Sequence, residues 1–98
     1  MKDTISYSII DYLYSFGINK IFMVPGGGNM FLVDAIGRHP KVNSVSTHNE
    51  QSAVIAAEAY SRLSNKIGVA LVTTGPGASN SITGIAGSWL DSVPLLVI

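Results

Sequence analysis

Residues 67–80, with the sequence IGVALVTTGPGASN, decide the fold that we predict for this chain. Residues 67–72 are apolar or glycine, which is typical of a central parallel strand whose two faces are both covered. A Gly-Pro-Gly turn follows at positions 75–77, and residues 78–90 continue in a helical pattern. A strand, a tight turn and a helix form the repeating unit of a parallel α/β sheet, and ligands of such sheets bind where the strands end.

The same alternation of strand and helix patterns runs through the rest of the chain. We predict further strands over residues 21–24, 42–46 and 94–98, with helical segments between them. Strands connected in this way run parallel and have right-handed crossovers. The sequence therefore predicts an α/β fold of three layers, α/β/α, with a parallel sheet, in one domain over residues 1–98.

Three helices are expected before residue 67. The first begins at Asp3 or Thr4 and ends at Gly17, and the second is capped by Asn29 and stops at Gly37 and Pro40. The third, residues 50–63, is rich in alanine, so another helix can approach it closely. Two glycines inside the helix of residues 78–90 indicate the same close approach. The stripe of the first helix that we expect to be buried consists of Ile5, Ile9, Leu13 and Phe16.

The composition narrows the possible classes of protein. Of 98 residues, 47% are hydrophobic and only 12% charged, with a formal net charge of +0, so part of the surface is expected to be covered by a partner. No basic stripe for nucleic acid is present. Neither a transmembrane stretch nor a signal-peptide core follows the opening residues 1–4, and the chain has no cysteine, so we expect a cytoplasmic protein. Because the chain stops within an apolar strand, we expect it to be the front part of a longer protein.

Glu50 is the candidate for chemistry. It stands at the start of the alanine-rich helix, at the end of the sheet where ligands bind. An apolar wall around it would raise the pKa of its carboxyl group and let it exchange a proton near neutral pH. The alternative is a purely structural capping box, in which Glu50 folds back on the backbone amide of Thr47.

Two glycine-rich bends flank this position in the predicted sheet, at residues 25–28 (PGGG) and 75–77 (GPG). The second resembles a dinucleotide-binding fingerprint only at its first two glycines, and the proline between them removes an amide that a pyrophosphate would need. Neither bend carries the lysine of a nucleotide-binding P-loop. Both bends can equally be plain tight turns between a strand and a helix.

The remaining polar residues have structural interpretations. His39 and His48 lack partners at metal-ligand spacing, so each is expected to be a surface or hydrogen-bonded histidine, and no metal site is predicted. Glu58 and Arg62 are expected to form an exposed pair one helical turn apart, without a catalytic role. Asp34 and Asp91 are expected to cap or solvate helix ends.

Several blocks together resemble a known family. They are residues 24–27 (VPGG), Glu50-Gln51, 56–62 (AAEAYSR), 73–80 (TTGPGASN) and 86–94 (AGSWLDSVP). In this order and spacing they resemble thiamine-diphosphate-dependent enzymes of the acetolactate synthase and pyruvate oxidase type. The resemblance covers nearly the whole chain and implies the opening part of a pyrimidine-binding domain, a truncated form of the thiamine-diphosphate-binding fold.

The resemblance implies roles for named residues. A glutamate at the place of Glu50 hydrogen-bonds N1′ of the aminopyrimidine and favours its 4′-imino tautomer, which removes the C2 proton of the thiazolium ring before a 2-oxo acid is decarboxylated. Gly26 and Gly27 would lie near the thiazolium ring and the substrate. The residues that match positions near the pyrimidine are Thr74, Pro76 and Asn80. The loops that carry these residues would converge, because the first strand of the family's sheet lies between the second and the third.

The resemblance also implies what these 98 residues lack. Many relatives have histidine directly before the glutamate, where this chain has Asn49, so His48 receives no role. In the family, the diphosphate and Mg²⁺ are held by a separate domain of another subunit with a Gly-Asp-Gly motif, which implies a homodimer or homotetramer and an inactive isolated segment. FAD use stays open, because a flavin would bind a domain outside this chain.

The expected function is therefore that of an N-terminal segment of a 2-oxo acid decarboxylating enzyme, a carboligase similar to acetolactate synthase. Two alternatives remain open from the sequence. One is a stand-alone α/β binding or assembly module without catalysis, and the other is a flavin or nicotinamide domain. The substrate itself cannot be named, because substrate-contacting residues of such enzymes come largely from other domains.

Overall fold

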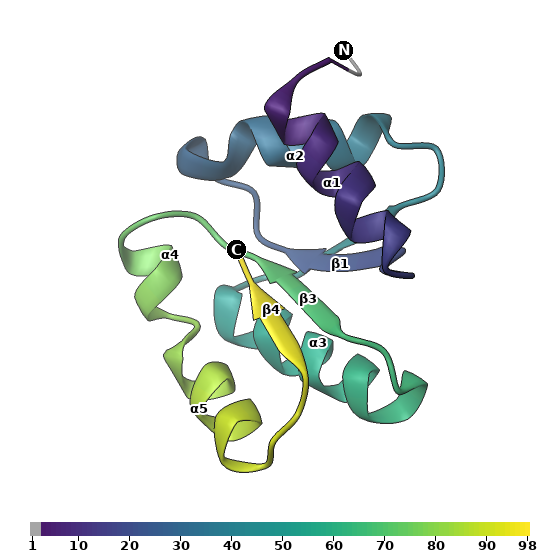
Figure 1. The fold of residues 1–98 in the computed structure, drawn as a ribbon. Helices are drawn as coiled ribbons and strands as arrows, with labels where there is room; N and C mark the ends of the chain where they lie inside the picture. Colours follow the sequence, from purple (N-terminus) through teal and green to yellow (C-terminus); the bar gives the residue numbers. More distant parts are fainter. Residues whose placement is uncertain (1–2) are drawn as a thin grey trace.

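The computed structural model describes residues 3–98, so Met1 and Lys2 of the opening segment lie outside the described residues. It shows a parallel sheet with helices on both faces, which confirms the predicted three-layer α/β/α fold (Figure 1). The elements in chain order are α1 (Ile5–Ser15), β1 (Lys20–Met23), the 3-10 helix η1 (Gly27–Asn29), α2 (Met30–Arg38), β2 (Asn43–Ser46), α3 (Glu50–Ser64), β3 (Gly68–Leu71), α4 (Pro76–Ser79), α5 (Ile82–Leu90) and β4 (Leu95–Val97).

The strand order of the sheet is β2-β1-β3-β4, with all neighbouring strands parallel. Met23 at the end of β1 pairs with Ser46 of β2 on one side and with Leu71 of β3 on the other. The carboxyl ends of the first three strands therefore meet at one edge. This arrangement confirms the expectation that the first strand lies between the second and the third.

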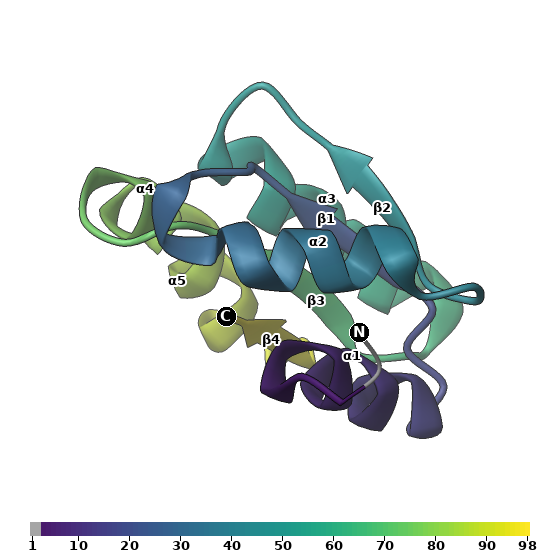
Figure 2. The same ribbon diagram turned by 90° about the horizontal axis from the view of Figure 1, so that it is seen from above.

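Two apolar layers hold the helices on the sheet, and the period of two along each strand separates them. Ile21 and Met23 of β1 and Leu71 of β3 belong to the larger core beneath α1 and α2. Phe22 and Ala70 belong to the smaller core beneath α3. Figure 2 shows the sheet between these two groups of helices.

The buried face of α1 differs from the prediction. Of the predicted stripe, Leu13 packs against the core, but Ile5 and Phe16 are 81% and 62% exposed. The buried residues of α1 are instead Tyr7 and Ile10. Helix α1 carries apolar residues on two stripes, and the stripe of Tyr7 and Ile10 is the one that packs against the sheet. The other stripe borders an apolar groove beside β4, which is lined in part by Tyr12, Phe16, Leu95 and Leu96.

Two further local predictions hold only in part. Asn29 is the N-cap residue of α2, but its side chain does not bond to the helix: its amide oxygen accepts a hydrogen bond from the Gly26 amide at 2.8 Å, and its amide nitrogen donates to the Val24 carbonyl at 3.2 Å. The helix predicted over residues 78–90 is two helices, α4 and α5. The chain bends between them because the backbone amide and the hydroxyl of the buried Ser81 both bond to the carbonyl of Ala78.

The close approach predicted from small residues is present. A Cβ atom at Gly84 of α5 would lie 2.5 Å from Cγ1 of Val54 in α3, and one at Gly68 of β3 would overlap the carbonyl oxygen of Ala57. Val54 and Ala57 are fully buried. Helix α3 is therefore tightly enclosed between α5 and the sheet. Within residues 3–98, no helix has the length and apolar character needed to cross a bilayer.

Candidate active site

Thr73, two residues after the end of β3, joins the two glycine-rich bends. Its hydroxyl oxygen accepts a hydrogen bond from the amide of Gly28 at 3.1 Å. A Cβ atom at Gly26, or one at Gly77, would lie 2.8 Å from the Thr73 side chain. The bends at residues 25–28 and 75–77 thus meet over one threonine, as expected from the strand order.

The N-terminus of α3 places Glu50 beside this junction. Asn49 is the N-cap, and its side-chain oxygen accepts a hydrogen bond from the Ser52 amide at 2.8 Å. The Thr47 amide donates to the Met23 carbonyl, which extends the sheet instead of bonding to Glu50. The capping-box alternative is therefore wrong, since the Asn49 side chain caps the helix and Glu50 is its first residue.

The carboxylate of Glu50 is fixed by a residue thirty positions later. Asn80, at the bend between α4 and α5, donates from Nδ2 to Oε1 of Glu50 at 2.9 Å. Oε2 faces Gly77, where a Cβ atom would lie 3.3 Å away. A small residue at position 77 therefore leaves access to this oxygen.

The electrostatics of Glu50 contradict the prediction of a raised pKa. The hydrogen bond from Asn80, and then that from the backbone amide of Glu50, lower the pKa of this carboxyl group, and only slight burial opposes them. Hydrogen bonds to the charged form stabilise it. In this chain Glu50 is thus a partly exposed, ionised carboxylate, and not an acid enclosed in an apolar wall.

The other predicted site residues surround the same edge. Thr74 lies beside Gly28, where a Cβ atom would approach its hydroxyl oxygen to 3.0 Å, and Pro76 is the first residue of α4. Gly27 is in η1 and has open space around its Cα. Thr73 receives no role from the sequence. Its position as the first polar residue after the clearest strand is the signal that could have identified it.

The histidines take no part in this site. His48 is exposed, and His39 is buried on the far side of the sheet between Tyr7 and Tyr14. Nδ1 of His39 accepts a hydrogen bond from the Lys41 amide, so Nε2 carries the proton that faces Asp11 at 3.1 Å. His39 is therefore the hydrogen-bonded histidine that the sequence predicted.

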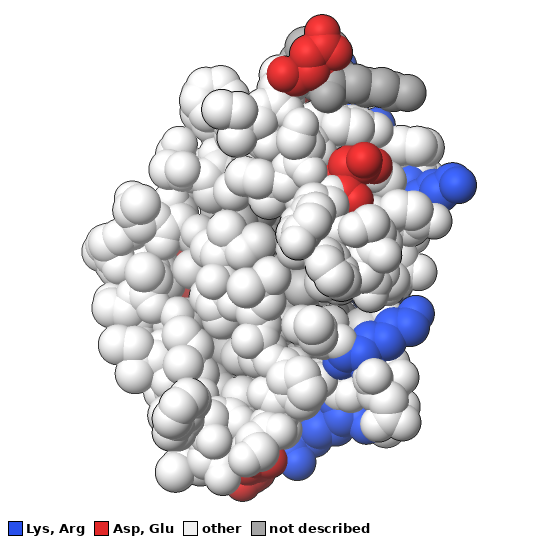
Figure 3. Space-filling model, in the orientation of Figure 1, with Lys and Arg blue, Asp and Glu red and all other residues white. Residues whose placement is uncertain are grey.

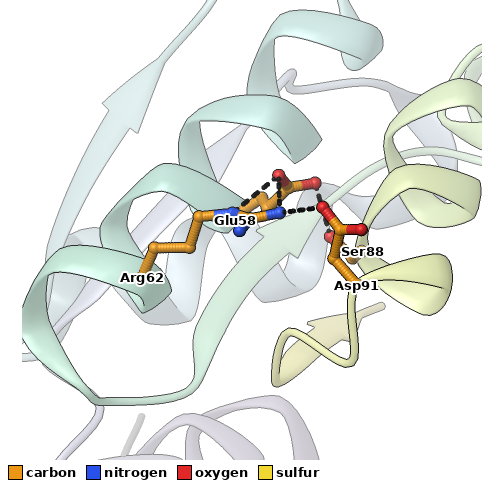
Figure 4. A network of polar contacts seen from close by, with 4 residues as sticks. All are labelled: Glu58, Arg62, Ser88 and Asp91. Atoms are coloured by element: carbon orange, nitrogen blue, oxygen red, sulfur yellow. Dashed lines mark hydrogen bonds and ion pairs between the residues drawn. The ribbon is translucent and has the colours of Figure 1, made fainter.

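The pair of Glu58 and Arg62 is part of a larger network between α3 and α5 (Figure 4). Arg62 also contacts Asp91 at 2.6 Å, and the hydroxyl of Ser88 donates to Glu58 at 2.9 Å. Asp91 is thus an ion-pair partner, and Asp34 pairs with Arg38 on α2, so neither carboxylate merely caps or solvates a helix end. The predicted pair of Glu58 and Arg62 one helical turn apart is therefore present, but it belongs to a network that also includes Ser88 and Asp91.

The glycines allow a flat group to approach the Glu50 carboxylate, which suits an aminopyrimidine ring. Gly77 leaves its face of Oε2 open, and Gly26 and Gly28 bring the other bend against Thr73. In residues 3–98, three or more His, Asp or Glu side chains nowhere gather closely enough to hold a metal ion.

Comparisons with known proteins identify the family of this chain. The family model "Thiamine pyrophosphate enzyme, N-terminal TPP binding domain" matches residues 3–98. The chain is 45% identical over 92 residues to the acetolactate synthase large subunit of Lactococcus lactis subsp. lactis (strain IL1403), which covers 94% of this chain and 16% of that protein. It is 42% identical over 96 residues to acetolactate synthase of Arthrospira platensis, covering 95% and 17%.

A chloroplastic acetolactate synthase of Arabidopsis thaliana is 40% identical over 90 residues, which covers 92% of this chain and 13% of the plant protein. The chain thus spans 13% to 17% of the length of these relatives. The family resemblance predicted from the sequence blocks is confirmed. Because the family model covers almost every residue, this chain belongs to the thiamine pyrophosphate enzymes and corresponds to their N-terminal TPP binding domain.

Proposed function

We propose that this chain is the opening part of the pyrimidine-binding domain of an acetolactate synthase-like carboligase, which decarboxylates 2-oxo acids with thiamine diphosphate. The relatives named acetolactate synthase support the enzyme class. The observation that carries the proposal is the Glu50 carboxylate at the carboxyl end of the sheet, fixed by Asn80 and open beside Gly77. Glu50 is in this proposal the residue that bonds to N1′ of the aminopyrimidine.

The residues of this chain would bind and orient the pyrimidine. Oε2 of Glu50 is available to hold a proton shared with N1′, while Oε1 stays bonded to Asn80. Thr74 and Pro76 would border the ring, and the bend of Gly26 and Gly27 would face the substrate. Thiamine diphosphate, when bound, supplies the thiazolium carbon that attacks a 2-oxo acid and the ring that accepts the electrons released on decarboxylation.

In this proposal the protein is a homodimer or homotetramer, and a second subunit completes the site. The diphosphate and Mg²⁺ would then be held by residues outside this chain, and FAD use is left open. Figure 3 supports a covered surface, because the face over α4, α5 and β4 carries almost no charged side chains. Trp89 and Leu90 of α5 are 83% and 79% exposed. Large exposed apolar side chains of this kind favour a protein partner.

The test is Glu50→Gln in the full-length protein, with Asp34→Asn on α2 as a matched control at an exposed carboxylate. We expect Glu50→Gln to abolish hydrogen–deuterium exchange at C2 of bound thiamine diphosphate, measured by NMR, and the control to exchange at the wild-type rate. Exchange at the wild-type rate in Glu50→Gln would exclude Glu50 from the mechanism. Calorimetric titration with thiamine diphosphate and Mg²⁺ tests binding, and a panel of 2-oxo acids then identifies the substrate.

Absence of thiamine diphosphate binding to the full-length wild-type protein would favour the alternative of a binding or assembly module without catalysis. Cofactor binding is thus the first measurement that separates the enzyme from the binding or assembly module, and C2 exchange is the second. Binding with exchange supports the enzyme, and binding without exchange in the wild type contradicts the proposed role of Glu50.

A further inference from the structure

Helix α3 and the α4–α5 segment contact each other at a constant sequence spacing. Glu50 bonds to Asn80 and Glu58 bonds to Ser88, each pair thirty residues apart. Val54 meets Gly84 midway between these two contacts, at the same spacing. Residues four apart on a helix lie on one face, so the three contacts form a continuous seam between two parallel helices. We call these six residues the α3–α5 seam.

The middle of the seam leaves no room for adjustment. Val54 is fully buried, and Gly84 lies so close that a Cβ atom would come within 2.5 Å of it. Close-packed interiors transmit a displacement instead of absorbing it. A shift of α5 at one end of the seam must therefore appear at the other end.

The far end of the seam is held by the network of Figure 4. Glu58 accepts hydrogen bonds from Ser88 of α5 and from Arg62 of its own helix, and Arg62 reaches Asp91 at the end of α5. Ser88 is 2% exposed, so water cannot replace Glu58 as the partner of its hydroxyl. Glu58 thus bonds within α3 and to α5, and Arg62 adds a second link between the two helices through Asp91.

A short rigid connection links α5 to Asn80. Ser81 precedes α5, is 1% exposed, and its carbonyl accepts the backbone hydrogen bond of Ile85. Asn80 comes directly before Ser81, and its own amide bonds to the Pro76 carbonyl. The position of the Asn80 side chain is therefore set by where α5 sits on α3.

We propose that Glu58 is a positioning residue for Glu50: by holding α5 to α3 through Ser88 and Arg62, it keeps Asn80 Nδ2 in contact with Glu50 Oε1. The inference rests on the proposed function of Glu50 and deepens it. Glu58 lies two helical turns from Glu50 and itself contacts neither the bends nor Gly77. Its effect on the carboxylate passes through the helix seam and Asn80.

The test is a double-mutant cycle in the full-length protein, with Glu58→Gln, Asn80→Ala and both together. We expect Glu58→Gln to slow hydrogen–deuterium exchange at C2 of bound thiamine diphosphate about three- to tenfold, the size of coupling between neighbouring side chains. The acid limb of the pH–rate profile for this exchange should move to higher pH in Glu58→Gln. Glu50 binds its proton more tightly when it loses the hydrogen bond from Asn80. In the Asn80→Ala background, Glu58→Gln should change neither the rate nor the acid limb.

Asp34→Asn is the matched control, since Asp34 pairs with Arg38 on α2 at the same spacing but away from the seam. Asp91→Asn provides a second variant at an exposed position, in case Glu58→Gln folds poorly. A crystal structure of each cofactor-free variant gives a readout independent of activity. We expect the Asn80 Nδ2 to Glu50 Oε1 distance to lengthen beyond hydrogen-bonding range in Glu58→Gln and to stay at 2.9 Å in the control.

Additive effects of Glu58→Gln and Asn80→Ala, or an unchanged contact in the Glu58→Gln crystal structure, would overturn the inference. These results would leave the proposed function intact. Wild-type exchange in Glu50→Gln, in contrast, would remove the proposed role of Glu50, and the crystallographic comparison would still decide whether Glu58 holds Asn80. The two failures are therefore distinguishable.

Discussion

Gly77 lies directly against the carboxylate of Glu50. A Cβ atom at this position would stand 3.3 Å from Oε2 and 2.8 Å from Cγ2 of Thr73. Gly77 is buried, and the 2.8 Å approach to Thr73 is closer than two carbon atoms normally pack. The bend and the carboxylate thus form one unit, and the absence of a side chain at position 77 determines its shape.

Gly77→Ala should weaken thiamine diphosphate binding. The added methyl group must displace Thr73 or Glu50, and overpacking of this kind costs about 1–3 kcal/mol, or roughly five- to 150-fold in affinity. Calorimetric titration of the full-length protein measures the change. Gly37→Ala is the control, because a Cβ atom there meets nothing within 4 Å. Equal affinities for the two variants would show that the bend tolerates a side chain.

Thr73→Val should loosen the bend of residues 25–28. Valine keeps the methyl group that faces Gly26 and Gly77 but replaces the oxygen that accepts the Gly28 hydrogen bond. One such bond contributes about 0.5–1.5 kcal/mol, so we expect up to about a tenfold loss of cofactor affinity. Thr73→Ser keeps the hydroxyl and should retain more of the affinity. The opposite order of the two variants would contradict a role for this hydrogen bond.

The hydrogen bond between Asn80 and Glu50 should make stability depend on pH. It lowers the pKa of Glu50 in the folded protein below the ordinary value of 4.5, so it stabilises the fold above that value and the effect is lost as the pH falls through the lowered pKa. Asn80→Ala should therefore reduce the melting temperature at about pH 7 and have a smaller effect at about pH 3. A reduction that is the same at both values would mean that Asn80 does not act through the charge of Glu50.

Gly84→Ala should destabilise the protein through a clash with Val54. We expect about 1–3 kcal/mol from overpacking at this contact. Val54→Ala removes the methyl groups that the new Cβ atom would meet, so the double variant should lose less stability than the two single changes together predict. Denaturant unfolding of the four proteins measures the coupling. Simple additivity would mean that α3 and α5 can move apart at this point.

Strong local patterns determined most of the fold. The apolar run of residues 67–72 produced the central strand β3, and Gly84, one of the two glycines within the predicted helix of residues 78–90, was correctly interpreted as a site of close approach. The buried face of α1 was not predictable in the same way, because the helix has two apolar stripes and spacing alone does not say which one meets the sheet.

The details of the site depended on contacts between distant residues. The pKa of Glu50 is set first by Asn80, thirty residues later, and local sequence cannot show that the chain bends at Ser81 to bring it there. Thr73 acts on both glycine bends only because the strand order places them side by side. The site was thus located from the sequence, but its electrostatics came from tertiary packing.

The parallel seam also polarises this part of the molecule. Helices α3 and α5 point the same way, so the positive ends of both helix macrodipoles lie toward Glu50 and the negative ends lie toward Arg62 and Asp91. The Glu50 carboxylate at the positive N-terminal ends and the Arg62 cation at the negative C-terminal ends are both stabilised by the dipoles. The carboxylate of Asp91 at the negative ends is destabilised by them, and Arg62 neutralises its charge. The two aligned dipoles thus favour the charged form of Glu50 at one end of the helices and stabilise the Arg62 guanidinium at the other.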